Sequence, residues 1–305
     1  MRALTRLVLG GAAAGAAGLA YAHWEAKQFA LRFRTVPVLA PGADPIRILH
    51  LSDMHFVPGH TAKHAWVQSL AALEPDLVVV TGDFIAHEDA IPHVLDTLEP
   101  LFASPGVFVF GSNDYFAPTP LNPAKYLAGP SQLEPTRVML PWTDLVDGLQ
   151  DNGWADLRNT SARIPMHGGF IDARGVDDPH ISRDDYAAIA GPFAEDAVLR
   201  LGLTHAPYLR ILDAMVADGA DLVMAGHTHG GQLCLPGYGT LVTNCDLDPR
   251  RGKGLSSHSA HGHTAALHVS AGLGTSPYAP FRFACRPEAA VLTVVPRAET
   301  TDPLR

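Results

Sequence analysis

Short apolar runs that stop at polar, turn-forming residues recur along the chain from residue 46 onward. Runs of this length predict buried β-strands, and the helix-like segments between them indicate an α/β fold. Two stretches, Trp66–Leu73 and Leu209–Ala217, carry apolar residues at helical spacing. The expected strands are Ile46–Leu51, Leu77–Thr81, Val107–Phe110, Phe170–Ala173, Val198–Leu203, Leu222–Ala225, Ala265–Ser270 and Ala289–Val295.

Five of these runs end at loops that carry Asp, His or Asn side chains. In open α/β sheets the ligand site lies beyond the carboxyl ends of the strands, so we expect the five loops to meet at one edge. In Asp53-x-His55 and His227-x-His229, alternation along an extended segment would put both side chains on one side. The loops are Asp53-Met54-His55, Gly82-Asp83, Gly111-Ser112-Asn113-Asp114, Thr204-His205 and Gly226-His227-Thr228-His229.

The donors in these loops are carboxylate and amide oxygens and imidazole nitrogens, without a thiolate. This set suits Mn, Fe, Zn or Co, and it is too large for one ion but fits two that share a carboxylate. We therefore expect two divalent or trivalent transition-metal ions. The cysteines Cys234, Cys245 and Cys285 have no C-x-x-C spacing and are expected to be buried free thiols.

Composition limits the class of protein. The 305 residues include 22 Lys and Arg against 31 Asp and Glu, which gives a net charge of −9, and no basic run is present. This balance argues against a nucleic-acid scaffold, because such proteins bind through neutralisation of phosphates. An anionic substrate would need a local positive charge, which metal ions can supply.

The N-terminus carries an apolar segment, Leu7–Trp24, that follows Arg2 and Arg6 and lacks charged residues. It fits a signal-anchor, which we favour, or a cleaved signal peptide, because Ala20-Tyr21-Ala22 has the small-x-small form of a cleavage site. The protein is accordingly expected to be membrane-associated or exported, on a side of the membrane that the flanking charges leave open. The expected divisions are 1–24 for this segment, 25–44 for a linker and first strand, 45–296 for one domain and 297–305 for a tail.

In order and spacing, the five loops resemble the signature of the calcineurin-like metallophosphoesterase family. The block Gly226–Gln232, with Ser270–Ser276 and Arg286-Pro287-Glu288, is similar to the membrane-associated bacterial branch, that of UDP-diacylglucosamine pyrophosphatase-like phosphohydrolases. The resemblance covers residues 45–296. It implies a four-layer α/β fold, with two mixed β-sheets sandwiched between helices, and hydrolysis of phosphate esters or anhydrides by a hydroxide that bridges two ions.

The resemblance also implies a ligand set, in which one carboxylate, Asp83, bridges the two ions. The remaining ligands are Asp53, His55 and His229 for one ion, and His205, His227 and an amide of the 111–114 loop for the other.

One loop departs from the family pattern Gly-Asn-His-Asp, in which the Asn binds metal and the His, oriented by the Asp, assists the leaving group. Ser112 stands at the Asn position and Asn113 at the His position, followed by Asp114. Because Ser is a poor neutral ligand, we expect the loop to shift so that the Asn113 amide binds the metal, with Ser112 as the alternative. Asp83, Asn113 and Asp114 are the expected catalytic residues. The loop has no imidazole, which should slow the expulsion of poor leaving groups unless another acid, such as His87, replaces it.

Three functions fit these residues. The first is a membrane-associated dimetal phosphohydrolase that cleaves phosphodiester or pyrophosphate bonds in lipid-linked or nucleotide-diphospho substrates. The second is an exported, broad-specificity phosphodiesterase acting on soluble or cell-wall phosphates, and the third is a non-catalytic metal-binding module. The proline-rich stretch Ala117–Pro141 is interpreted as an inserted lid or a surface excursion over the site, and the stretch around His258, His261 and His263 as a solvated loop.

Overall fold

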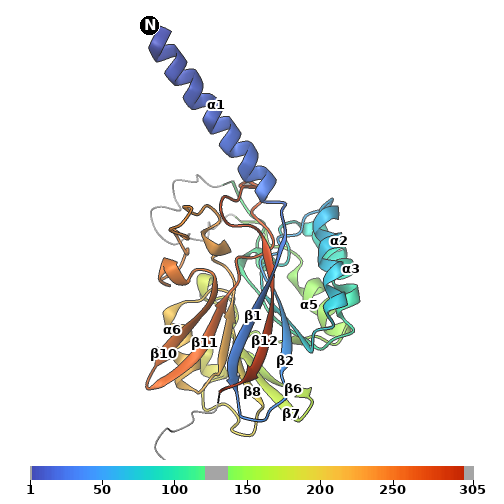
Figure 1. Cartoon of the computed structure of the whole chain (residues 1–305). Coiled ribbons are helices and arrows are strands. Elements are labelled where there is room, and N and C mark those ends of the chain that lie inside the picture. Colours follow the sequence, from blue (N-terminus) through green and yellow to red (C-terminus); the bar gives the residue numbers. More distant parts are fainter. Residues whose placement is uncertain (1, 121–136, 299–305) are drawn as a thin grey trace, which may run out of the picture.

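The structure is a computed structural model that describes residues 2–120 and 137–298. Two β-sheets pack face to face, helices cover the outer face of each, and helix α1 (Arg2–Glu25) projects from one end (Figure 1). The first sheet has the order β1-β12-β2-β3-β4-β5. Its strands are β1 (Ala30–Leu39), β12 (Glu288–Pro296), β2 (Ile46–Leu51), β3 (Leu77–Thr81), β4 (Gly106–Val109) and β5 (Ala155–Asp156).

The second sheet has the order β10-β11-β9-β8-β7-β6. Its strands are β10 (Gly254–Ala260), β11 (His263–Val269), β9 (Leu222–Ala225), β8 (Leu199–Leu203), β7 (Gly169–Gly175) and β6 (Thr160–Met166). Both sheets are mixed. Strands β2 to β5 are mutually parallel, as are β7, β8, β9 and β11, whereas β12 runs antiparallel to β2, β6 to β7 and β10 to β11.

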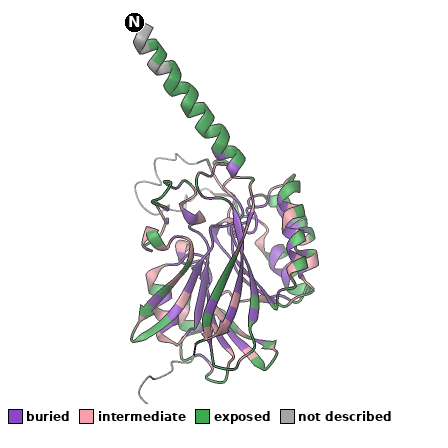
Figure 2. Ribbon diagram, viewed as in Figure 1, coloured by how far each residue is buried: buried purple, intermediate pink, exposed green. Residues whose placement is uncertain are grey.

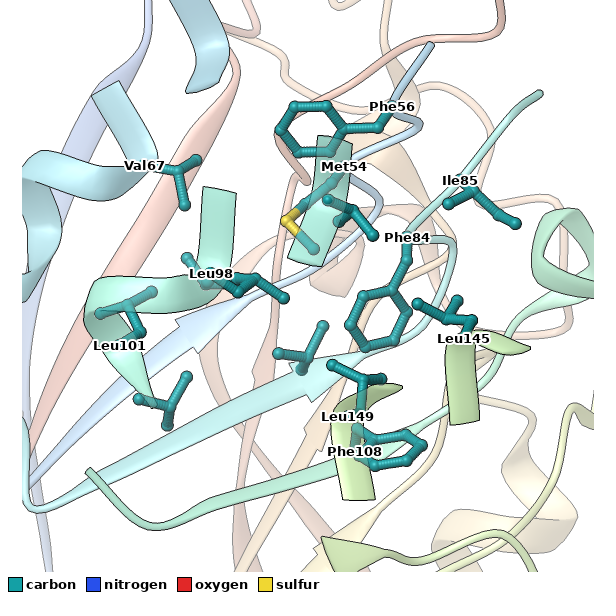
Figure 3. Close-up of a cluster of buried hydrophobic side chains, with 14 of the residues drawn as sticks. Met54, Phe56, Val67, Phe84, Ile85, Leu98, Leu101, Phe108, Leu145 and Leu149 are labelled. Carbon is teal, nitrogen blue, oxygen red and sulfur yellow. The ribbon is translucent and has the colours of Figure 1, made fainter. Parts of the chain in front are cut away.

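Three apolar clusters hold the layers together. One fills the space between the sheets and includes Ile48, Val79, Leu201 and Met224. A second packs the outer face of the first sheet against the helices α2 (Thr61–Ser69), α3 (Ile91–Leu98) and α5 (Trp142–Asp151) (Figure 3). A third packs α6 (Leu209–Ala217) on the outer face of the second sheet. The order helix, sheet, sheet, helix confirms the expected four-layer fold.

Several elements have the expected bounds. Strands β2, β3 and β9 and helix α6 coincide with the predicted ranges, and the predicted helix 66–73 corresponds to the end of α2 and a 3-10 turn, Leu70–Leu73. The interpretation of the stretch around His258 as a solvated loop was wrong for that residue, whereas His261 and His263 are exposed at the turn between β10 and β11. His258 lies in β10, its side chain is buried, and its Nε2 is 2.7 Å from Oδ1 of Asp213 in α6.

Helix α1 leaves the body of the molecule with most of its side chains exposed (Figure 2). Its last turns contact the body of the molecule, because Ala22 and Glu25 are buried and Glu25 accepts hydrogen bonds from the backbone N–H groups of Ala284 and Cys285. In the part of the chain that the structure describes, no helix combines the length and apolar character needed to cross a membrane.

The two ends of the expected lid meet. Ala117 N donates to Val138 O over 2.8 Å, and Phe116 forms an antiparallel bridge with Met139. The interior of this stretch, residues 121–136, and most of the tail, residues 299–305, lie outside the described residues.

The fold predicts that the stability of the protein is sensitive to substitutions in the apolar cluster between the sheets. Leu201→Ala in β8 removes a fully buried side chain from the inter-sheet cluster, so it should lower the free energy of unfolding by about 2–5 kcal/mol through lost burial and a residual cavity. Urea unfolding followed by circular dichroism measures the loss. Leu255→Ala in β10, where the side chain is 37% exposed, is the control and should cost much less.

Candidate metal centre

The polar loops lie at the carboxyl ends of parallel strands in both sheets. The loops after β2, β3 and β4 carry Asp53, His55, Asp83 and Asn113, and the loops after β8 and β9 carry His205, His227 and His229. Backbone contacts tie neighbouring loops together, since Asp53 N donates to Gly82 O and His55 N to Asp83 O, both over 2.9 Å. Each sheet therefore supplies part of one site.

The backbone at these positions differs from the expectation. The side chains of Asp53 and His55 do not share a side through alternation in an extended segment, because β2 ends at Leu51 and both residues have positive φ. Such φ values cost non-glycine residues about 1–3 kcal/mol each and are typical of functional sites. The affected candidate ligands are Asp53 (48°), His55 (44°), Asp83 (55°), His227 (68°) and His229 (49°).

One group of four side chains is compact enough to hold an ion. Asp53, His55, Asp83 and His229 each offer a ligand atom, and these atoms all lie within 4.8 Å of one another. His55 Nε2 is 3.4 Å from Asp83 Oδ2, His229 Nε2 is 3.5 Å from Asp53 Oδ1, and the two Nε2 atoms are 3.2 Å apart. Two imidazoles and two carboxylates directed at one point form a suitable transition-metal site.

On the other side of Asp83 lies a second group. His205 Nε2 is 3.6 Å from Asp83 Oδ2 and has no hydrogen-bond partner, although it is buried. His205 Nδ1 donates to Thr81 O over 2.7 Å, so in the neutral ring Nε2 carries the lone pair. The ring of His227 is 5.2 Å from that of His205, and its Nε2 contacts the carbonyl oxygen of Asn244. A buried, unpartnered imidazole nitrogen beside a carboxylate fits a second ion that shares Asp83.

Electrostatics favours positive charge at this centre. Burial lowers the pKa of His205, but Asp83, Asp178 and Asp53 outweigh it and raise that pKa to about 9. Burial also opposes ionisation of Asp83, yet His205, His55 and the hydrogen bonds from Asn113 hold its pKa below the ordinary value. A proton or a metal ion near His205 would balance these carboxylates.

The other three candidate histidine ligands are neutral imidazoles, the form that binds metal ions. Burial lowers the pKa of His55 to about 4 and lowers those of His227 and His229 well below the ordinary value. These imidazoles are therefore neutral at neutral pH, with a lone pair for coordination.

The loop that differs from the family pattern leads into α4 (Ser112–Tyr115) and places Asn113 next to Asp83. Asn113 Nδ2 donates to Asp83 Oδ2 over 2.8 Å, and its backbone N–H donates to Oδ1 over 2.9 Å. Asn113, rather than Ser112, therefore contacts Asp83, while its Oδ1, the atom expected to bind metal, lies 3.4 Å from Nη2 of Arg137.

Asp114 has a different role from the one expected. Its carboxylate accepts backbone N–H groups from Gly111, Asp83 and Phe84 over 2.7–2.9 Å, so it joins two ligand loops instead of orienting Asn113. Asp114 is a positioning residue. His87, considered as a substitute acid, has a side chain that is 47% exposed, and its Nδ1 accepts the Asp89 N–H. This exposed placement does not support His87 as the acid.

Further polar residues, which the strand-end pattern did not single out, lie around the site. His180 lies with its ring 4.5 Å from that of His227, and Asp178 is fully buried with a pKa that burial raises to about 7. The run Asp177-Asp178-Pro179-His180 follows β7, so it is a sixth polar loop at a strand end and could have been found by the same rule. Arg137 approaches Asn113, with its Nη2 3.4 Å from Oδ1.

A buried arginine and two cysteines form hydrogen bonds with the backbone of the loop that carries His229. Arg282 is fully buried and donates to the carbonyl oxygens of Ala271 and Gly274, each over 2.7 Å. Cys234 and Cys285 are buried free thiols, as predicted, and each hydrogen-bonds to Gly230 O. Cys245 is also free but only partly buried.

This fold and this cluster suit a metal-dependent phosphoesterase. Residues 46–231 match the model of the calcineurin-like phosphoesterase family, and the chain belongs to that family, as the five loops predicted. It is therefore a hydrolase that acts on phosphoester bonds.

Three relatives extend the comparison. The metallophosphoesterase YkuE of Bacillus subtilis (strain 168) is 28% identical over 261 residues, which cover 83% of this chain and 80% of the relative. The phosphodiesterase YaeI of Escherichia coli (strain K12) is 26% identical over 289 residues, 92% of this chain and 94% of the relative. A transmembrane protein with a metallophosphoesterase domain from Bos taurus is 27% identical over 217 residues, 65% of this chain and 44% of the relative.

The central position of Asp83 predicts different metal losses for different variants. Asp83→Ala removes the carboxylate between the two histidine groups, so both ions should be lost, whereas His55→Ala should lose mainly one. Elemental analysis after gel filtration measures the metal content. Asp213→Asn alters a carboxylate paired with His258 outside the site and is the control. Near-full occupancy in the Asp83 variant would contradict a shared carboxylate.

Proposed function

We propose that the chain is a dinuclear-metal phosphohydrolase that cleaves phosphodiester or pyrophosphate bonds with residues 45–296 as its catalytic domain. The observation that carries this proposal is Asp83, which lies within 3.6 Å of imidazole nitrogens from both ligand groups. Two transition-metal ions, when bound, would activate water and neutralise phosphoryl oxygens. Asp53, His55, His229, His205, His227 and Asn113 would complete the ligand set.

The residues of the 111–114 loop predict a preference among substrates. Asn113 occupies the position where the family carries histidine, and an amide cannot donate a proton as an acid. The guanidinium of Arg137 lies next to Asn113 and can stabilise negative charge, but it does not release its proton either. We therefore propose that this site favours leaving groups that depart without protonation, such as phosphate groups.

Leaving-group dependence tests this preference. Without an acid, negative charge builds up on the departing oxygen, so single-turnover rates should fall steeply from nitrophenyl esters and anhydrides to alkyl diesters. The double variant Ser112→Asn with Asn113→His rebuilds the family pair and should accelerate alkyl diesters by roughly 10²–10⁴-fold while changing anhydrides little. Similar wild-type rates for alkyl and nitrophenyl diesters would contradict the proposal.

We further propose that the end of the molecule bearing the metal centre contacts a membrane surface, which would give access to lipid-linked substrates. β1 runs antiparallel to β2 across β12, so α1 joins the body at the end where the ligand loops lie. Exposed apolar side chains gather there. We call this group the apolar rim; it consists of Tyr21 (47% exposed), Trp24 (56%), Leu233 (53%), Leu235 (52%), Tyr238 (72%) and Tyr278 (56%).

The apolar rim is continuous with the base of α1. The ring of Tyr21 is 5.6 Å from that of Phe283, and Phe283 forms a parallel bridge with Leu233. Trp and Tyr side chains are enriched where proteins meet the membrane interface, since their rings are apolar with one polar atom. Lys27 and Arg286 are exposed near the same junction and would favour anionic lipid.

Vesicle binding tests the role of the apolar rim. The full chain should sediment with vesicles of phosphatidylcholine and phosphatidylglycerol, and Leu235→Asp or Tyr238→Asp should each weaken binding about tenfold, because an apolar contact is replaced by a charge. Leu255→Asp, at an exposed apolar position in β10, is the matched control. Equal binding by the rim variants and this control would remove the support for a membrane surface.

A further inference from the structure

A continuous chain of hydrogen bonds connects the second sheet to the metal centre. His268 in β11 has its Nδ1 2.8 Å from Nδ1 of His50 in β2, and His50 Nε2 is 2.9 Å from Thr81 Oγ1. Thr81 donates to Ser52 Oγ over 2.7 Å, and Ser52 donates to Asp53 Oδ2 over 2.6 Å. All five side chains are buried, with at most 1% exposure.

The direction of every hydrogen bond in this chain is set by Asp53. A carboxylate only accepts, so the single hydroxyl proton of Ser52 points to Asp53. Ser52 must then accept from Thr81, and Thr81, having donated its own proton, accepts from Nε2–H of His50. Burial lowers the pKa of His50 well below the ordinary value, so its ring is neutral and its Nδ1 must accept from His268.

We propose that these four residues form a positioning relay for Asp53, and that their purpose is to present its Oδ1 to the metal ion. The inference rests on the proposed dinuclear site. Both oxygens accept the backbone N–H of His227 over 3.1 Å. Oδ2 also accepts the Ser52 hydroxyl, whereas Oδ1 lies 3.5 Å from Nε2 of His229, another candidate ligand. Each donor in the row polarises the next, which strengthens the final hydrogen bond to the carboxylate.

The relay also fixes the distance between the candidate ligands carried by the first sheet and those carried by the second. His50 and Thr81 belong to the first sheet and His268 to the second, so the hydrogen bond between the two imidazoles joins the sheets. Apolar side chains could fill the space between the sheets equally well and would not require each histidine to adopt one tautomer. In this row of hydrogen-bonded side chains every member has a partner, and the row ends on the candidate ligand Asp53. A role in holding Asp53 explains this arrangement better than a role in packing the sheets.

The central member offers the sharpest test. Thr81→Val keeps the size and shape of the side chain but breaks the relay, whereas Thr81→Ser keeps the hydroxyl. Thr97→Val in α3 is the matched control, because Thr97 is equally buried and its hydroxyl also contacts a histidine, Nδ1 of His64 over 2.8 Å. Folding is checked by circular dichroism and gel filtration.

The readout is Mn²⁺ affinity of the metal-stripped full chain, measured by competition with a chelator. Thr81→Val should weaken one of the two sites by about 10–100-fold, as is typical for residues that orient metal ligands. Thr81→Ser should restore near wild-type affinity, and Thr97→Val should leave both affinities unchanged even where it lowers the melting temperature.

The outcomes separate the relay from the dinuclear assignment. Unchanged affinity in Thr81→Val, with wild-type protein binding two ions, would overturn the relay alone. Wild-type protein that binds fewer than two ions would overturn the proposed dinuclear function. If Thr81→Val does not fold, His268→Leu takes its place with His268→Asn as rescue, since the Asn amide can donate from the position of Nδ1.

Discussion

The close contact between the two sheets at Asp53 is the constraint on which the site depends. The backbone N–H of His227, from the second sheet, donates to both carboxylate oxygens of Asp53 over 3.1 Å. Gly226 is required just before it, because a Cβ atom there would lie 1.9 Å from Ser52 Oγ and 2.6 Å from Asp53 Oδ2. Without this approach, the ligands carried by the two sheets would not share one volume.

Because the two sheets approach each other here, charged and ionisable side chains are buried together away from water. Buried carboxylates need a compensating positive charge, and the carboxylates of Asp83, Asp178 and Asp53 accordingly raise the pKa of His205 to about 9. The strained φ values of the ligand residues add to the unfavourable free energy. The apolar clusters between and outside the sheets stabilise the frame that keeps this arrangement, which explains why the ligands lie on loops and the frame lies beneath them.

The sequence predicted the features that depend on local pattern. Buried strands with continuous apolar runs, such as β3 and β9, were found within a residue of their ends, and the polar loops after them marked the site. Features that depend on tertiary pairing were not found. β10 alternates weakly and gains its order from pairing with β11, and His50 and His268 are ordinary strand residues until the two sheets bring them together.

The change from the family pattern is confined to a loop whose shape does not depend on the altered residues. Asp114 holds this loop through backbone N–H groups, so Ser112 and Asn113 can differ from the usual pair without loss of the turn. Asn113 still contacts Asp83 from this position. Under the proposed function, the candidate metal ligands and the leaving-group chemistry are therefore separable in this fold: contacts between the sheets fix the first, and two side chains on one loop would set the second.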